Sequence, residues 1–118
     1  MKIAMPSENG LLFGHFGRAP QFEVFTIDNE NNTINHEKLN SPPHENCSTA
    51  IWLNELSDNV VIVSGIGQGA INHLNNMNIK ILAGAEIKKT DDLLKDFIGN
   101  SLKLIETTCN HDHHGCHN

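Results

Sequence analysis

Short apolar runs bounded by prolines and asparagines mark the first half of the chain. Lys2 to Met5 is a mainly apolar run that stops at Pro6, and Phe22 to Asp28 is rich in aromatic and β-branched residues, so both predict strands. The asparagine-rich stretch that follows allows the positive φ of a turn, and Thr33 to Leu39 lies at hairpin distance. We therefore expect the second and third strands to pair antiparallel and to end at residues 41–43 (Ser-Pro-Pro).

Helical and strand patterns alternate in the second half. Val60 to Val63 is a continuous apolar run, which is typical of a strand buried on both faces of a parallel sheet. Ile79 to Ala83 predicts the next strand, and Leu102 to Glu106 is a candidate for a short last one. Three helices are also predicted. The first is capped by Ser48 or Thr49 and carries Ile51, Trp52, Leu53 and Leu56 on its apolar face, and the second carries Ala70, Ile71, Leu74 and Met77. The third begins at Thr90, Asp91 and Asp92 with the Thr90 hydroxyl as its cap, buries Leu93, Leu94, Phe97 and Ile98, and ends at Gly99.

This order, β-β-β-α-β-α-β-α, predicts an α/β domain whose mixed β-sheet is ribonuclease-H-like in outline, is flanked by helices and has Val60 to Val63 at its centre. We expect a single domain over residues 1–106 and a separate tail over residues 107–118. If the first strand is parallel to the later ones, the loops at 6–21, 40–48, 65–69 and 84–89 share the edge formed by the carboxyl ends of the strands. A ligand is expected at that edge.

Composition and missing motifs exclude several classes of function. The chain has 118 residues with eight Lys and Arg against 14 Asp and Glu, a formal net charge of −6 that disfavours binding to a nucleic-acid backbone. No apolar run approaches the ~20 residues that span a bilayer, so we expect no membrane partner and a cytoplasmic protein. Common catalytic motifs such as Gly-x-Ser-x-Gly, the Walker loop and His-Glu-x-x-His are missing, and we expect no enzyme. Positions where a ribonuclease-H nuclease would carry Mg²⁺-binding carboxylates hold Ala4, Met5, Ile62 and Ser64.

The segment from Gly14 to Pro20 combines two glycines, a histidine, an aromatic residue and an arginine. One interpretation is a presented imidazole, His15, that ligates a metal beside a guanidinium, Arg18, that holds an anionic group. The alternative is a structural turn in which Phe16 packs on Phe22 and Arg18 is merely solvated. Both interpretations remain open at the level of the sequence.

Glycines at 65, 67 and 69 follow the Val60 to Val63 strand. The Gly65-x-Gly67-x-x-Ala70 spacing, with Glu86 about 20 residues on, superficially matches a dinucleotide fingerprint, but the domain is very small for that fold. Backbone N–H groups of Gly65, Gly67 and Gly69 at a helix start could bind another anion. A tight strand-to-helix turn is the alternative.

The tail, residues 107–118, is the third candidate binding site. Six soft or borderline metal donors fall within nine residues, and an odd set of three cysteines makes a disulfide framework improbable. Zn²⁺ or another transition metal is expected there, either in one defined site or loosely held. His44 and Cys47 form a weaker pair in which the thiol pKa could be lowered, and an ordinary buried or idle cysteine is the alternative. The predicted tail ligands are Cys109, His111, His113, His114, Cys116 and His117.

Several of these segments resemble the dinitrogenase iron–molybdenum cofactor biosynthesis family. The resemblance lies in His15 to Phe22 (HFGRAPQF), in the run from Val60 to Gly67, in Leu74 to Ile81 and in the closing Cys/His cluster. That family includes stand-alone carriers of the nitrogenase cofactor or its precursors, the carboxyl-terminal domain of the cofactor-core synthase, and the molybdenum–copper orange proteins. The resemblance implies a ribonuclease-H-like fold and the binding or transfer of a metal–sulfur cluster without turnover of a substrate. It also implies a cofactor-synthesis or acceptor protein as partner, with His15 and Arg18 as cluster contacts.

Three functional hypotheses follow. The first is a carrier that holds an anionic metal–sulfur cofactor, of the iron–molybdenum type, through His15, Arg18 and the N–H groups around Gly67 to Gly69. The second is a metallochaperone or sensor that binds Zn, Ni or Cu through the tail, with the core as a docking scaffold. The third is a nicotinamide-dependent oxidoreductase. If Leu102 to Glu106 extends the sheet parallel to Ile79 to Ala83, the tail leaves at the edge that holds His15 and Gly67. If Gly99 and Asn100 instead turn the chain antiparallel, the tail leaves at the opposite edge.

Overall fold

The structure is a computed structural model that describes residues 1–41, 48–56 and 59–105. A six-stranded sheet has the order β4-β3-β1-β5-β6, and β2 pairs with β1 outside that path. The strands are β1 (Lys2–Glu8), β2 (Leu11–Leu12), β3 (Gln21–Ile27), β4 (Thr33–Asn40), β5 (Val60–Val63) and β6 (Lys80–Ala83). The helices are α1 (Ser48–Glu55), α2 (Gln68–Asn76) and α3 (Thr90–Ile98), with a 3₁₀ turn, η1, at Phe16–Arg18.

Strand directions confirm the predicted mixed, ribonuclease-H-like α/β sheet. β1 is parallel to β5, and β5 is parallel to β6, whereas β3 is antiparallel to both β1 and β4. The predicted hairpin is therefore present, with its two strands at Gln21–Ile27 and Thr33–Asn40. The two-residue strand β2 is an element that the sequence pattern did not predict.

The middle strand of the sheet is β1, so the prediction that Val60 to Val63 lies at the centre is wrong. β5 is nevertheless an interior strand, and all four of its residues are buried. β1 takes the centre because the β3–β4 hairpin adds to one side of it and the parallel strands add to the other. The apolar run correctly predicts burial, but burial alone does not distinguish a central strand from its neighbour.

Pro6 does not end the first strand, which continues to Glu8. Parallel pairing between β1 and β5 involves only Ile3 and Ala4 of β1, so no amide donor toward β5 is required at Pro6. The carbonyl oxygen of Pro6 accepts the N–H of Phe13 at 2.8 Å. A proline near the end of a strand is tolerated under these conditions.

The hairpin turn is built by Asp28. Its Oδ1 accepts the backbone N–H groups of Glu30 and Asn32, each at 2.9 Å, and Asn31 supplies the positive φ of 64°. These bonds, led by the one from Asn32, lower the pKa of Asp28 because they favour its ionised form. The predicted role of the asparagine-rich stretch is thus confirmed.

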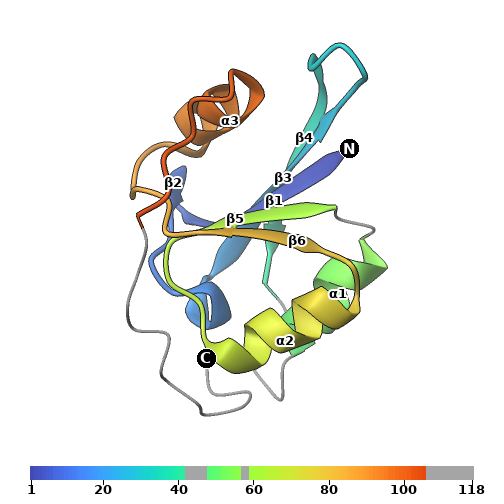
Figure 1. The fold of residues 1–118 in the computed structure, drawn as a ribbon, viewed down its shortest axis with the longest axis vertical. Coiled ribbons are helices and arrows are strands. Elements are labelled where there is room, and N and C mark those ends of the chain that lie inside the picture. The colour runs from blue at the N-terminus through green and yellow to red at the C-terminus, as the bar shows by residue number, and fades with distance from the viewer. Residues whose placement is uncertain (42–47, 57–58, 106–118) are drawn as a thin grey trace.

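Helices cover both faces of the sheet (Figure 1). On one face α1 and α2 pack through Leu53 and Leu74 against a cluster that includes Phe22 and Val61. On the other face α3 packs through Leu93 and Leu94 against Ile3, Phe25 and Ile62, together with the rest of the second cluster. This gives three layers, helix–sheet–helix. Among the described residues, no helix is long and apolar enough to cross a membrane.

All three predicted helices form, with local differences. In α1, Leu53 is fully buried, but Ile51 is 48% exposed, so its predicted place on the apolar face is wrong. The side chains of Ser48 and Thr49, the predicted caps, lie outside the described residues. Thr90 does not cap α3: Lys89 occupies that position, while Thr90 is buried as the first helical residue. Gly99 is at the carboxyl cap, but the residue with positive φ is Asn100.

Of the two directions that the sequence left open, the segment after α3 takes the antiparallel one, and it forms no strand within the described residues. Leu104 makes only an isolated antiparallel bridge with Ala85, and the N–H of Ile105 donates to the carbonyl of Gly84 at 2.8 Å. Glu106 lies outside the described residues. The chain turns at Asn100 and returns to the loop that follows β6, where the last described residue, Ile105, lies.

Candidate functional site

The loops that follow β1, β5 and β6 meet at the carboxyl ends of these strands, as predicted. His15 forms a parallel bridge with Gly65, and Leu11 forms an antiparallel bridge with Lys89. Both bridges join segments that are far apart in the sequence. At the edge where a ligand is expected, residues 11–16, 64–65 and 84–89 therefore lie next to one another and are joined by backbone hydrogen bonds.

His15 stands at the start of η1 with an extended backbone, φ −128°, and an exposed side chain. The next residue, Phe16, is only 2% exposed and anchors the turn in the core. Its ring packs edge-to-face on Phe22 at a centroid distance of 5.6 Å, and Phe22 packs in the same way on Trp52 at 5.5 Å. The predicted structural contact between Phe16 and Phe22 is confirmed, and it leaves the neighbouring imidazole accessible to a ligand.

Arg18 is the last residue of η1 and is also exposed. Its backbone N–H donates to the carbonyl of His15 at 3.1 Å, so the short turn fixes the spacing between the two residues. The two ion pairs of the described residues, His36 with Glu23 and Lys88 with Asp96, do not involve Arg18. Its guanidinium charge is therefore available to an anion at this edge.

Gly65 holds the His15 segment against β5. Its N–H donates to the carbonyl of Gly14, and its carbonyl accepts the N–H of Phe16, both at 3.0 Å. A Cβ at residue 65 would lie 2.7 Å from the carbonyl oxygen of Gly14. Because this amide is already bonded within the protein, Gly65 contributes close backbone approach to the site.

Replacing Gly65 by alanine is expected to lower the free energy of unfolding by about 1–2 kcal/mol, because the new methyl group meets a backbone oxygen that cannot rotate away. The His15 turn would move away from β5. Thermal or urea unfolding measures the loss. Gly10→Ala is an informative comparison: no atom lies within 4 Å of a Cβ there, so any cost comes from its positive φ of 82°. If Gly65→Ala left the free energy of unfolding unchanged, the close approach between Gly65 and Gly14 would not contribute to stability.

The amino end of α2 lies beside this turn. Gly67 is the N-cap residue and, lacking a side chain, caps none of the first N–H groups of the helix. Gly69 is buried in the first turn. The glycines therefore make a helix start at which backbone donors, rather than side chains, are presented.

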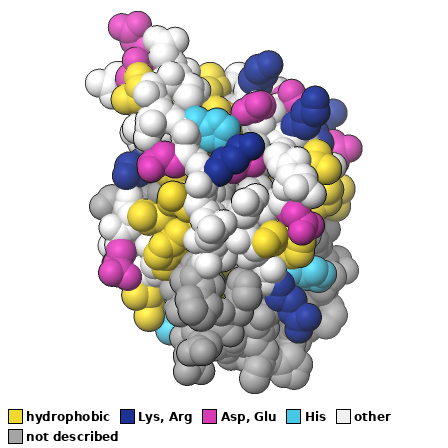
Figure 2. All heavy atoms as spheres, turned by 180° about the vertical axis from the view of Figure 1, so that it is seen from behind, with side chains coloured by type: hydrophobic (Ala, Val, Ile, Leu, Met, Phe, Trp, Pro, Cys, Tyr) yellow, Lys and Arg dark blue, Asp and Glu magenta, His cyan; other side chains and the backbone are white. Residues whose placement is uncertain are grey.

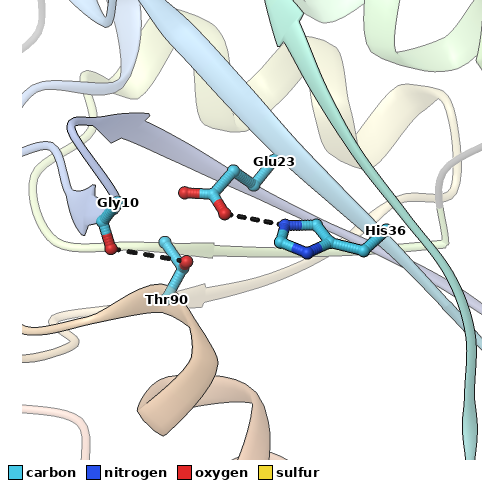
Figure 3. A network of polar contacts seen from close by, with 4 residues as sticks. All are labelled: Gly10, Glu23, His36 and Thr90. Atoms are coloured by element: carbon cyan, nitrogen blue, oxygen red, sulfur yellow. Dashed lines mark hydrogen bonds and ion pairs between the residues drawn. The ribbon is translucent and has the colours of Figure 1, made fainter.

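Away from this edge, the structure contains a buried polar pair that the sequence analysis missed. Glu23 on β3 is 2% exposed, and its Oε1 lies 2.8 Å from Nε2 of His36 on β4 (Figure 3). The imidazole also stacks on Phe25, with ring centroids 4.1 Å apart. The other carboxylate oxygen, Oε2, has no hydrogen-bond partner and points away from His36, toward the side of Gly10 and Thr90.

A signal for this pair exists in the sequence. Glu23 interrupts a run of apolar residues in a strand that reads Phe22-Glu23-Val24-Phe25. Charged residues are rarely fully buried unless they are paired. Ser7, which lies on the same sheet face, is also fully buried with an unbonded hydroxyl. Glu23 and Ser7 are thus buried polar side chains on the sheet face that α3 covers.

The predicted tail ligands, and His44 and Cys47, lie outside the described residues. Within the described ranges, no group of three or more His, Cys, Asp or Glu side chains is placed to hold a metal ion. Figure 2 shows acidic and basic side chains interspersed over one face of the molecule. Any anion selectivity at His15 and Arg18 therefore has to arise from local geometry, because the net charge is −6.

Comparison with known proteins identifies the fold and its family. Residues 1–100 match the model of the dinitrogenase iron–molybdenum cofactor family. The chain belongs to this family. An uncharacterized protein of Methanocaldococcus jannaschii, MJ0580, is 27% identical over 110 residues, which cover 90% of this chain and 92% of that protein.

Solved structures agree with this assignment. The crystal structure of PH0822 matches with a TM-score of 0.82 and 29% identity, covering 88% of this chain and 94% of that chain. The apo form of the orange protein from Desulfovibrio gigas matches with a TM-score of 0.72 and 21% identity, covering 88% of this chain and 92% of that chain. The second likeness is one of fold, and the fold of the dinitrogenase iron–molybdenum cofactor family is therefore shared across divergent sequences.

Proposed function

We propose that this member of the dinitrogenase iron–molybdenum cofactor family is a small carrier that binds an anionic metal–sulfur cluster and passes it to another protein. The observation that carries the proposal is the exposed pair His15 and Arg18 on one short turn, held against Gly65 at the carboxyl edge of the sheet. The family match supports a cofactor of the iron–molybdenum type as the cargo.

The donor set suits such a cargo. An imidazole is a good ligand for a transition metal at one apex of a cluster. A guanidinium offers several N–H donors to sulfide or carboxylate groups around the metal, and the nearby start of α2 adds a partial positive charge. An imidazole can also act as a base, but among the described residues no printed hydrogen bond or ion pair joins His15 to a second titratable side chain. The residues support binding rather than catalysis.

The exposure of the site favours exchange. A single imidazole on an open turn holds a cluster less firmly than a closed set of four protein ligands does. Several apolar side chains on the surrounding segments are also exposed, which favours contact with a second protein. We propose a cofactor-synthesis or acceptor protein as that partner, in a compartment such as the cytoplasm that keeps thiols reduced. The exposed residues are Leu11, Ile87, Leu104 and Ile105.

Titration with isolated iron–molybdenum cofactor under anaerobic conditions tests the proposal. Binding is followed by the fluorescence of Trp52, the only tryptophan, and by cofactor retained after gel filtration. His15→Ala is expected to raise the dissociation constant at least about tenfold, because one metal–ligand bond is lost. Arg18→Ala is expected to raise it about three- to tenfold through the loss of charge-assisted contacts.

Lys95→Ala is the matched control, since it removes one exposed positive charge on α3 and should leave the dissociation constant unchanged within about twofold. If His15→Ala and Arg18→Ala bind as tightly as the unmodified chain, the proposed site is wrong. The double variant Cys109→Ser with Cys116→Ser addresses the second hypothesis. If it alone abolishes uptake, the tail is the principal binding element and the metallochaperone function is favoured.

That second function, binding of Zn, Ni or Cu through the tail, is supported by one observation, the six donor residues within nine positions. Thiolate and imidazole together select borderline and soft metals. It differs from the carrier function in cargo, since a single metal ion needs no cluster-binding edge on the core.

A further inference from the structure

Two polar atoms lie buried beneath α3 without a hydrogen-bond partner among the described residues. They are Oε2 of Glu23 on β3 and the hydroxyl oxygen of Ser7 on β1, and the two residues are 2% and 0% exposed. Buried polar groups are nearly always bonded to protein, water or an ion, and a buried charge is costly unless it is compensated. A group that binds both atoms would therefore stabilise the folded chain.

The strand register places these two side chains next to each other. Glu23 lies opposite Met5 of β1, and Ser7 lies opposite Gln21 of β3, so Glu23 and Ser7 are diagonal neighbours on one face of the sheet. Diagonal neighbours on antiparallel strands are ~7–8 Å apart. The two atoms do not bond to each other. One small group between them can contact both.

The amino end of α3 offers a third oxygen. Figure 3 shows Oε2 of Glu23 pointing away from His36, toward the side of Gly10 and Thr90. Thr90 is 2% exposed, and its hydroxyl donates to the carbonyl of Gly10 at 3.5 Å, so the lone pairs of the hydroxyl are free to accept. Carboxylate and hydroxyl oxygens together are typical ligands of hard cations.

The charges around Glu23 favour a cation over a water molecule. Lys38 lies directly opposite Glu23 in the register, but it is exposed, and the ion pairs of the described residues do not include it. His36 contacts only Oε1, and a neutral imidazole donates a hydrogen bond there without adding a charge. The positive end of the α3 dipole already has Asp91 and Asp92 beside it. Water would bond to Oε2 but would leave its charge uncompensated.

We propose that Oε2 of Glu23 and the hydroxyl oxygens of Ser7 and Thr90 bind a monovalent alkali cation, Na⁺ or K⁺. The single carboxylate balances one positive charge, whereas Ca²⁺ sites commonly use several carboxylates. The cation joins β1, β3 and α3, and so braces the strand whose carboxyl end leads to the His15 loop. The proposal is independent of the carrier function, because alkali cations bind thiolates and imidazoles poorly.

Thermal unfolding of the full-length chain tests the proposal. The midpoint of unfolding is measured at one fixed ionic strength in NaCl, in KCl and in choline chloride, whose cation is too large for a buried site. We expect a midpoint at least about 3 °C higher in NaCl or KCl than in choline chloride, because a ligand that binds only the folded chain stabilises it. Chloride is common to the three salts, so the difference reports the cation.

Two variants locate the effect. Glu23→Gln keeps the size of the side chain but removes its charge, and it should abolish the difference between the salts. Ser7→Ala keeps the charge but removes one oxygen, and it should reduce the difference by at least about half. Glu37→Gln is the matched control, since Glu37 is exposed on β4 and lies opposite Val24, on the other face of the sheet. The difference should remain in this variant.

Amide signals of the ¹⁵N-labelled, unmodified chain provide a direct readout of the site. Replacing choline by Na⁺ or K⁺ should shift the signals of Ser7, Glu23 and Thr90 and leave that of Asn31 in the hairpin turn unchanged. Equal midpoints in the three salts, with unchanged Ser7 and Glu23 signals, would mean that water alone bridges the two atoms, and the proposal would be wrong. A salt difference that persists in Glu23→Gln would also overturn it, because the cation would then bind elsewhere.

Discussion

Replacing Phe16 by alanine is expected to lower the free energy of unfolding by about 3–5 kcal/mol and to weaken cofactor binding at least about tenfold. Phe16 is buried between the His15 turn and the core, where it contacts Phe22 edge-to-face. Removing the ring leaves a cavity and frees the turn that positions His15. The functional loss would arise without any change in a proposed ligand, which makes Phe16 a positioning residue.

Phe97→Ala separates the two effects. Phe97 is partly buried on α3 and packs on the opposite face of the sheet, in the second apolar cluster. Its removal should also destabilise the protein, by about 2–3 kcal/mol, but should leave the dissociation constant for cofactor unchanged under conditions where the variant is folded. Urea unfolding and the Trp52 titration measure both quantities. Equal weakening of binding by both variants would mean that Phe16 acts only through global stability.

Local patterns in the sequence predicted most of the fold. The continuous run at Val60–Val63 and the asparagine-rich turn after Ile27 each determine a structure through residues that are close together in the chain. Other details depend on distant partners, so the sequence predicted them wrongly or left them open. Pro6 is tolerated since β5 pairs only with the start of β1, and the segment after Asn100 turns antiparallel because Gly84 offers it a carbonyl.

The candidate edge was predictable from topology, since the carboxyl ends of parallel strands have to meet. The contact between His15 and Gly65 was not, because it depends on a backbone approach that no periodic pattern encodes. Of the two interpretations of the His15 segment, the structural one is confirmed by the contact between Phe16 and Phe22, and ligand binding by His15 and Arg18 stays a prediction. Phe16 makes the structural turn, and by doing so it presents His15 and Arg18.

The pair formed by Glu23 and His36 should couple the edge strand β4 to the sheet. Replacing His36 by alanine is expected to lower the free energy of unfolding by about 2–3 kcal/mol. The change leaves the carboxylate of Glu23, which is 2% exposed, without its 2.8 Å partner, and it removes the ring that stacks on Phe25. Asn35→Ala on the same strand is the control, and a change within about 0.5 kcal/mol is expected there.

The double variant Glu23→Met with His36→Ala decides the cause. Methionine fills a similar volume without a charge, so the double variant should regain at least about 1 kcal/mol relative to His36→Ala alone. Such a recovery means that the cost of His36→Ala comes from an unpaired buried carboxylate. If the two substitutions are simply additive, the imidazole stabilises β4 through its stacking on Phe25, and the buried acid has no energetic link to it. Urea unfolding of the four proteins of this cycle provides the measurement.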